Sequence, residues 1–256
     1  MGEYTDIDLH VTDRIGTLTL MRDDLNVLNI AMMNEINEAL ESLANGHDLK
    51  MLVIRAKGKA FSAGVDVSEH TADKVDDMIG TFHRIFRLLD TIECPTVALV
   101  QGAALGGGCE LACFCDMVVA SDRAKFGQPE IKVGVFPPVA AASFPESTAL
   151  KSVYELLLIG DTILADEAQR IGLVNKVYPR DSFESDAEEW LARLASNSAV
   201  ILRQTKKAIQ AGLGKPFIEA LGAAEQIYLG EMMSTKDAHE GLAAFMDKRS
   251  PKWVDE

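Results

Sequence analysis

The N-terminal part of the chain alternates hydrophobic and polar residues, and the next segment repeats hydrophobic residues every three to four positions. Two runs rich in β-branched residues, IDLHV and IGTLTLM, are separated by the polar residues 12–14, which predicts a β-hairpin. After Asn29, the hydrophobic residues of IAMMNEINEALESL fall on one helical face, and Asn45 and Gly46 supply a stop signal. The pattern predicts an opening hairpin followed by an amphipathic helix.

Further along, short and nearly continuous apolar runs alternate with helical patterns. The runs MLVIRA at 51–56 and TVALVQG at 96–102 flank a helix that we expect over 75–92. Two more strand-like runs follow, MVVA at 117–120 and LVNKVYP at 173–179. A strand, a long helix and another strand in succession indicate parallel crossovers, and such strands need helices on both faces. The sequence therefore predicts an α/β fold.

From about Ser182 onward the sequence contains helical patterns only. We therefore expect an α/β core over residues 1–195 and a helical C-terminal region over residues 196–256. The 256 residues, 48% of them hydrophobic, are enough to bury a sizeable core.

Charge, apolar runs and cysteine usage argue against several classes of protein. The net charge of −14 has its acidic residues scattered along the chain, which argues against nucleic-acid binding. The N-terminus does not resemble a signal sequence and no apolar run reaches the ~18 residues of a membrane span, so we expect no membrane partner and a cytoplasmic location. Three of the four cysteines lie within residues 109–115, which favours reduced core thiols over disulfides. The five histidines are dispersed singly, so we predict no metal site.

The stretch QGAALGGGCELACFCD at 101–116 places Gly106, Gly107 and Gly108 directly before an apolar helical run. Glycines between a strand and a helix allow backbone N–H groups to converge on a ligand without a Cβ in the way. A tight turn with close helix packing is the structural alternative. A dinucleotide phosphate loop is disfavoured because the GxGxxG spacing is missing and the first strand is far away.

A second turn of small residues, GKAFSAGVD at 58–66, follows the predicted strand 51–56. If the predicted strands are parallel neighbours, both turns lie at the carboxyl end of the sheet, where α/β folds bind ligands. Two backbone N–H groups could then point at one oxygen atom, which is the geometry of an oxyanion hole.

Two glutamates accompany these turns. Glu110 stands at the start of the apolar helix, and Glu130 follows a proline in the segment FGQPEIKVG. A glutamate after a proline is commonly an exposed residue without a role, and this interpretation stays open. If both side chains face one cavity, a carboxylate pair beside an oxyanion hole is equipped to transfer protons next to a thioester or a similar carbonyl.

In their order and spacing, these motifs resemble the enoyl-CoA hydratase/isomerase (crotonase) family over nearly the whole chain. The resemblance rests on LNVLNIAMMNEINEAL, AFSAGVDV, GGGCELACFCDMVVA, AKFGQPEIKVG, LLLIGDTILADEAQRIGLVNKVYP and FMDKRSPKW. It implies a crotonase-like (ClpP/crotonase) fold, a spiral of ββα units with a helical C-terminal trimerisation region. It also implies assembly as a homotrimer or as a homohexamer made of two trimers.

The resemblance further implies roles for individual residues. Val65, which follows the SAG turn, and Gly107, the second glycine of GGG, match the family's two N–H donors to the thioester oxygen. The carbonyl group around Ala63 would contact the adenine of coenzyme A. Lys248 or Arg249 would approach the CoA phosphates, from a neighbouring subunit.

Asp66 and Gly106, the neighbours of the two donors, are expected to bind the substrate. Hydratases that the chain resembles carry both glutamates, here Glu110 and Glu130, whereas isomerases and other branches often lack one. The implied reaction adds water across a double bond conjugated to a CoA thioester: Glu110 deprotonates water and Glu130 protonates the enolate carbon, or the reverse. No metal or redox cofactor is implied, and CoA is part of the substrate. The alternatives are an enoyl-CoA isomerase and a noncatalytic crotonase-fold binding protein.

The chain departs from the family pattern after PEIKVG. The family commonly continues with a glycine-rich PGxGG turn, whereas this chain reads VFPPVAAASFPE. Phe136, Pro137 and Pro138 would form a stiffer and more apolar wall beside Glu130, because proline fixes φ where glycine leaves it free. One interpretation is a neutral loop variant. The other is a pocket for a compact acyl group, similar to what we expect of the hydratases of cyclohexa-1,5-diene-1-carbonyl-CoA in anaerobic benzoyl-CoA breakdown; a general short-chain enoyl-CoA hydratase is the alternative.

Overall fold

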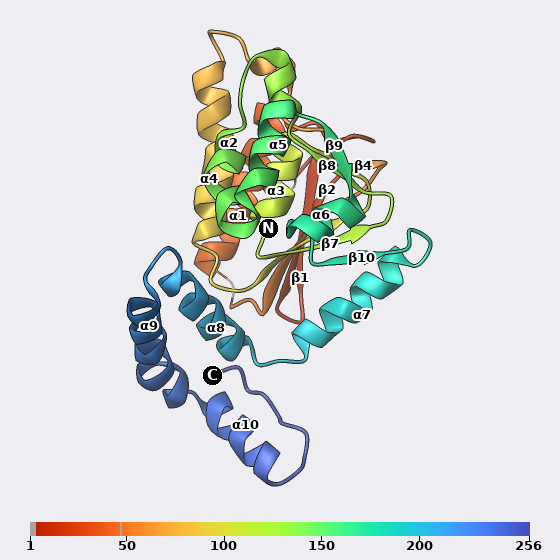
Figure 1. The fold of residues 1–256 in the computed structure, drawn as a ribbon. Helices are drawn as coiled ribbons and strands as arrows, with labels where there is room; N and C mark the ends of the chain where they lie inside the picture. Colours follow the sequence, from red (N-terminus) through yellow and green to blue (C-terminus); the bar gives the residue numbers. More distant parts are fainter. Residues whose placement is uncertain (1–3, 47) are drawn as a thin grey trace.

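A computed structural model describes residues 4–46 and 48–256, which form two β-sheets surrounded by helices (Figure 1). The larger sheet has the strand order β1-β2-β3-β5-β7-β10. Its first pair is antiparallel, which confirms the predicted hairpin, and every other neighbouring pair is parallel. Its strands are β1 (Ile7–Thr12), β2 (Ile15–Leu20), β3 (Met51–Ala56), β5 (Thr96–Val100), β7 (Met117–Ser121) and β10 (Lys176–Tyr178).

The smaller sheet has the order β4-β6-β8-β9 and consists of β4 (Ala60–Ser62), β6 (Ala103–Leu105), β8 (Lys125–Gly127) and β9 (Thr162–Leu164). The sequence did not predict this sheet, because strands of three residues are too short to show a hydrophobic period. The strand expected over 96–102 ends at Val100, since the chain turns before β6. A Cβ on Gly102 would lie 2.1 Å from the carbonyl oxygen of Lys59, so the backbones pass too closely for a side chain. The strand expected over 173–179 is likewise shorter.

The chain repeats a ββα unit. In each unit one strand joins the larger sheet, the next strand joins the smaller sheet, and a helix leads the chain back toward the larger sheet. β3, β4 and α2 (Val75–Asp90) form one such unit, and β5, β6 and α3 (Gly107–Phe114) form the next. This arrangement confirms the predicted α/β spiral of ββα units. The helix α1 (Ile30–Gly46) begins after Asn29, whose side chain accepts a hydrogen bond from the Met32 N–H at 2.9 Å, as the sequence predicts. Three further helices are α4 (Pro138–Ser147), α5 (Leu150–Ile159) and α6 (Ala165–Ile171).

Both faces of the larger sheet are buried, and successive residues of a strand belong to different hydrophobic clusters. Leu52 and Ile54 of β3 pack into the main core with α1 and α2. Met51 and Val53 pack instead into a second cluster with α7 (Phe183–Ala195). This two-sided burial explains why the parallel strands read as continuous apolar runs.

The remaining helices are α8 (Ala199–Gly212), α9 (Phe217–Gly230) and α10 (Lys236–Met246), drawn in blue beside the core in Figure 1. The buried ammonium group of Lys206 fastens α8 to the core: its Nζ lies 2.8 Å from the carboxylate of Asp116, which is partly exposed, and donates to the Cys94 carbonyl at 3.1 Å. The predicted division of the chain at residue 195 stays a prediction. None of the helices within residues 4–46 and 48–256 has the length and apolar character needed to cross a membrane, and the cytoplasmic location stays a prediction.

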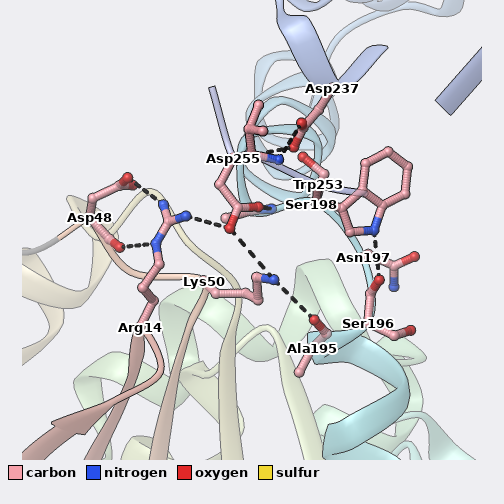
Figure 2. Close-up of polar contacts among 12 residues, drawn as sticks. Arg14, Asp48, Lys50, Ala195, Ser196, Asn197, Ser198, Asp237, Trp253 and Asp255 are labelled. Carbon is pink, nitrogen blue, oxygen red and sulfur yellow. Dashed lines mark hydrogen bonds and ion pairs between the residues drawn. The ribbon is translucent and has the colours of Figure 1, made fainter. Parts of the chain in front are cut away.

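Residues 253–255 form a C-terminal clasp between α10, the start of α8 and the core (Figure 2). The buried carboxylate of Asp237 accepts the backbone N–H groups of Val254 at 2.8 Å and Asp255 at 2.9 Å. The Asp255 carboxylate in turn accepts the N–H of Ala199 at 2.7 Å and forms an ion pair with Arg14 of the hairpin loop. The clasp therefore links three parts of the chain that lie far apart in sequence.

We predict that Asp237→Ala lowers the free energy of unfolding by about 2 kcal/mol, because it removes the acceptor of two partly buried backbone hydrogen bonds, each worth about 1 kcal/mol. Denaturant unfolding at a fixed protein concentration measures the change. Lys236→Ala, on the same helix, removes only an exposed ion pair with the C-terminal residue Glu256; it is the matched control and should change stability little. Equal stability of the two variants would show that the clasp contributes nothing.

Candidate active site

One cavity of about 530 Å³ lies where the two predicted small-residue turns meet. The two turns, helix α2 and the segment 129–138 form its walls. Eight of the residues proposed from the sequence line it together: Ala63, Val65, Gly106, Gly107, Glu110, Glu130, Phe136 and Pro137.

The two turns touch each other through positions that lack side chains. A Cβ on Gly64 (φ +101°) would lie 2.9 Å from the carbonyl oxygen of Leu105, and a Cβ on Gly107 would lie 2.7 Å from Val65 Cγ2. Real Cβ atoms do not approach this closely, so any side chain at Gly64 or Gly107 would force the turns apart. The glycines are therefore required by contact between the turns.

The backbone N–H groups of Val65 and Gly107 are free to bind a ligand. Leu28 and Val65 form a parallel bridge, in which the Leu28 N–H donates to Gly64 O at 2.9 Å and Leu28 O accepts the Asp66 N–H at 2.9 Å. In this pattern the amide of Val65 itself points away from Leu28. Gly107 is the first residue of α3, where a helix provides no acceptor. Neither amide finds an acceptor within residues 4–46 and 48–256.

Glu110 lies in the first turn of α3 and is 2% exposed. Its Oε1 atom accepts the N–H of Ala140 at 2.8 Å, near the start of α4. Burial, reinforced by the negative charge of Glu130, raises the pKa of Glu110 to about 7, although the N–H groups of Ala140 and Val139 act in the opposite direction. This carboxyl group can therefore gain or lose a proton near neutral pH.

Glu130 is half-buried in a 3₁₀ turn, Pro129–Val133. Burial raises its pKa, and a backbone N–H of its own turn acts in the opposite direction. A Cβ on Gly106 would lie 2.7 Å from Glu130 Oε1, so this glycine leaves room for the carboxylate. Both glutamates line the same cavity, and the pairing considered from the sequence is present.

Gln128 was missed by the reasoning from sequence. Its side chain is fully buried, and with the amide nitrogen turned toward Glu130 that nitrogen lies 3.1 Å from both carboxylate oxygens. The sequence signal that could have indicated this contact is the position of a polar residue two places before Glu130, in a segment otherwise short of charge. The apolar wall that α2 contributes to the cavity consists of Val75, Met78, Ile79 and Phe82. The sequence did not predict this wall, because hydrophobic residues at helical spacing indicate a buried face but not what that face contacts.

Two other proposed substrate-binding residues do not line the cavity. The Asp66 carboxylate accepts the N–H of Ser68 at 2.9 Å and its hydroxyl at 2.7 Å, and thereby caps a 3₁₀ turn. Lys248 is exposed after α10, and its neighbour Arg249 binds Glu240 at 2.7 Å. Their roles in CoA binding stay predictions.

The geometry combines two free backbone donors with one buried and one half-buried carboxyl group, and the pKa values of both carboxyl groups are raised. Free backbone donors stabilise an oxygen atom that gains negative charge, and carboxyl groups with a raised pKa exchange protons with a neighbouring carbon or water. The site is therefore suited to reactions through an enolate.

Comparison with known proteins identifies the family of the chain. Residues 11–256 match the family model for enoyl-CoA hydratase/isomerase. The chain is 36% identical over 255 residues to "Probable enoyl-CoA hydratase echA8" of Mycobacterium bovis, covering 98% of both chains. It is 32% identical to the crotonyl-CoA hydratase of Syntrophomonas wolfei, again covering 98% of both. The crystal structure of an enoyl-CoA hydratase from Bacillus anthracis superimposes with a TM-score of 0.91 at 29% identity, over 98% of this chain and 100% of that one.

The chain therefore belongs to the enoyl-CoA hydratase/isomerase family. The fold implied by the sequence resemblance is confirmed as well, since the Bacillus anthracis structure and the crystal structure of an enoyl-CoA hydratase from Mycobacterium smegmatis, with a TM-score of 0.90, share it over 98% and 97% of this chain.

We predict that Glu110→Gln stabilises the protein at high pH. The folded state holds the Glu110 proton up to about pH 7, whereas the unfolded chain releases it near 4.5, so stability is lost as pH rises between these values. The advantage of the variant over the wild type should grow by roughly 2 to 3 kcal/mol between pH 5 and pH 8. Denaturant unfolding at both pH values checks this; an advantage independent of pH would mean that Glu110 titrates normally.

Proposed function

We propose that this chain is a hydro-lyase that adds water to, or removes it from, a carbon–carbon double bond conjugated to a CoA thioester. The main support is the pair of carboxyl groups, Glu110 and Glu130, in one cavity with the free N–H groups of Val65 and Gly107. The names of the similar proteins, which are hydratases, point the same way.

In the proposed reaction, the thioester oxygen accepts hydrogen bonds from the Val65 and Gly107 N–H groups, and the positive end of α3 faces the charge that develops there. Glu110 takes a proton from water while the water oxygen bonds to the β-carbon. The π electrons move onto the thioester oxygen as an enolate. Glu130 then gives a proton to the α-carbon as the carbonyl re-forms, so one carboxyl group gains a proton and the other loses one. The reverse assignment of the two glutamates is chemically equivalent.

The energetic shares of these groups are comparable. One oxyanion-hole donor typically contributes about 3 to 4 kcal/mol, and a positioned acid or base contributes about 10² to 10⁴ in rate. Because the two contributions are similar, both the amides and the carboxyl groups are needed for efficient turnover.

For the substrate we propose a compact acyl group. Phe136, Pro137 and Pro138 line the cavity, and Pro138 begins α4 directly against the Glu110 pocket, which stiffens the wall where the family commonly carries glycines. Cyclohexa-1,5-diene-1-carbonyl-CoA is the ring substrate that this wall suggests. The similar protein named as a crotonyl-CoA hydratase favours a short linear chain as the second candidate. The Ala63 carbonyl, Asp66, Gly106 and Lys248 remain proposed contacts of the CoA ester.

We predict that the purified protein removes the absorbance of the conjugated thioester of crotonyl-CoA, cyclohexadienecarbonyl-CoA, or both. Glu110→Gln and Glu130→Gln should each lower kcat about 10² to 10⁴-fold with little effect on binding of the ester, because each removes one proton-transfer group. Glu146→Gln, an exposed glutamate of α4, is the matched control.

The kcat/KM values measured with crotonyl-CoA and with cyclohexadienecarbonyl-CoA decide which acyl group the enzyme prefers. Turnover of neither by the folded protein would overturn the hydratase proposal and favour a noncatalytic binding protein. Migration of the double bond without uptake of water would favour an isomerase.

We further propose that the chain assembles as a trimer or as two trimers. Helices α9 and α10 expose large apolar side chains, among them Phe217, Ile218, Leu229, Phe245 and Met246, at 72% or more. Large apolar side chains exposed to this extent are typical of an interface between subunits.

Light scattering should therefore give a particle of three or six chains of 27.8 kDa. A Phe245→Asp/Met246→Asp double variant should shift the protein to smaller particles, because a buried charge opposes assembly. His10→Asp, on the exposed face of β1, is the control and should leave the particle size unchanged. A wild-type protein that runs as a single chain would contradict the proposal.

A further inference from the structure

The loop between β2 and α1 contains a fully buried asparagine in the left-handed conformation, Asn26, with φ +49°. Every polar group of Asn26 is bonded. Its side-chain nitrogen donates to the carbonyls of Lys57 at 2.7 Å and Ala60 at 3.1 Å, and its side-chain oxygen accepts the Arg22 N–H at 3.1 Å. Its own N–H donates to Asp23 at 2.6 Å. A buried side chain bonded in this way holds the segments it contacts at a fixed distance.

The same loop runs along the turn that contains Val65. The Asp24 carbonyl accepts the N–H groups of Lys59 at 2.8 Å and Ala60 at 3.0 Å, and the Leu25 carbonyl accepts that of Ala63 at 2.8 Å. The bridge between Leu28 and Val65 completes the contact. The loop is thus an outer support for the turn, on the side away from the cavity.

Ser62 connects this support to both turns of the site. Its buried hydroxyl donates to the Asn26 carbonyl at 2.8 Å and accepts the Gly64 N–H at 3.2 Å. It also lies against α3: a Cβ on Gly108 would be 2.6 Å from Ser62 Cβ and 2.8 Å from its Oγ. One serine therefore contacts the loop, the turn before Val65 and the helix turn after Gly107.

We infer that Asn26 and Ser62 are positioning residues that set the separation and direction of the Val65 and Gly107 N–H groups. Neither lines the cavity, so each acts only through the backbone that it holds. The inference rests on the proposed function, in which both amides bind one thioester oxygen. A shift of a reacting group by about 1 Å can cost 10²-fold in rate, so a small relaxation of this network is measurable.

The primary test is Ser62→Ala, and Ser121→Ala is its matched control. Ser121 is also a buried serine, and its hydroxyl accepts the N–H two residues later, of Arg123, at 3.2 Å, but it lies in β7 away from the cavity. With the substrate that the wild type hydrates, Ser62→Ala should lower kcat about 10- to 100-fold at nearly unchanged KM. Ser121→Ala should keep the wild-type kcat per folded molecule. Asn26→Gly, which retains the left-handed backbone and removes the side chain, is the second variant and should behave like Ser62→Ala.

A spectroscopic measurement separates positioning from general loss of structure. Butyryl-CoA labelled with ¹³C at the thioester carbonyl has no double bond to react, and two well-aimed donors should shift its carbonyl stretch to lower frequency on binding. Ser62→Ala should lose part of that shift while still binding the ester, and Ser121→Ala should retain it.

Wild-type kcat in Ser62→Ala and Asn26→Gly, or an unchanged carbonyl band, overturns the inference and leaves the proposed function standing. If the wild type binds butyryl-CoA with a shifted band but hydrates nothing, the proposed function fails and the band still decides the inference. If the wild type binds no CoA ester at all, both are overturned.

Discussion

The close approach of two backbone turns, 62–66 and 105–108, is the constraint on which the rest of the site depends. The turns meet at Gly64, Gly107 and Gly108, where a Cβ would overlap neighbouring atoms. The proposed binding of one oxygen atom by the amides of Val65 and Gly107 depends on this separation. The ββα repeat brings the turns together, because each follows a short strand of the smaller sheet, and β4 pairs with β6 in parallel. The smaller sheet, although its strands are only three residues long, therefore places the two turns that form part of the cavity wall.

The site is held at a cost in stability. Glu110 is buried beside a second carboxyl group, and only backbone N–H groups from the start of α4 compensate. Such a group is neutral in the folded protein at low pH and opposes folding once it ionises. The large two-sided hydrophobic core around β3, β5 and β7 supplies the stability that offsets this penalty. A local arrangement that is unfavourable by itself is thus maintained by packing elsewhere, as functional sites commonly are.

The reasoning from sequence succeeded where a feature has a period or a required residue type. The hairpin, α1, α2 and the parallel strands follow from repeated hydrophobic positions, and the glycines of both turns follow from the need to omit side chains. It failed for contacts set by tertiary approach. Asn26 and Gln128 carry no local pattern that marks them as buried partners of other segments, and the three-residue strands carry no period. The sequence also gave no sign that the Asp66 side chain caps a local turn and does not line the cavity.

The proposed oxygen-binding groups belong to the backbone. Binding of the oxygen atom and the shape of the cavity therefore depend on different parts of the same residue. The Val65 side chain faces the cavity and contacts the Gly107 position, whereas the proposed donor is its amide. Substitution at position 65 can therefore reshape the cavity while the proposed donor amide is retained. Substrate preference can thus diverge by mutation at a residue whose amide is a proposed donor, without passing through an inactive intermediate.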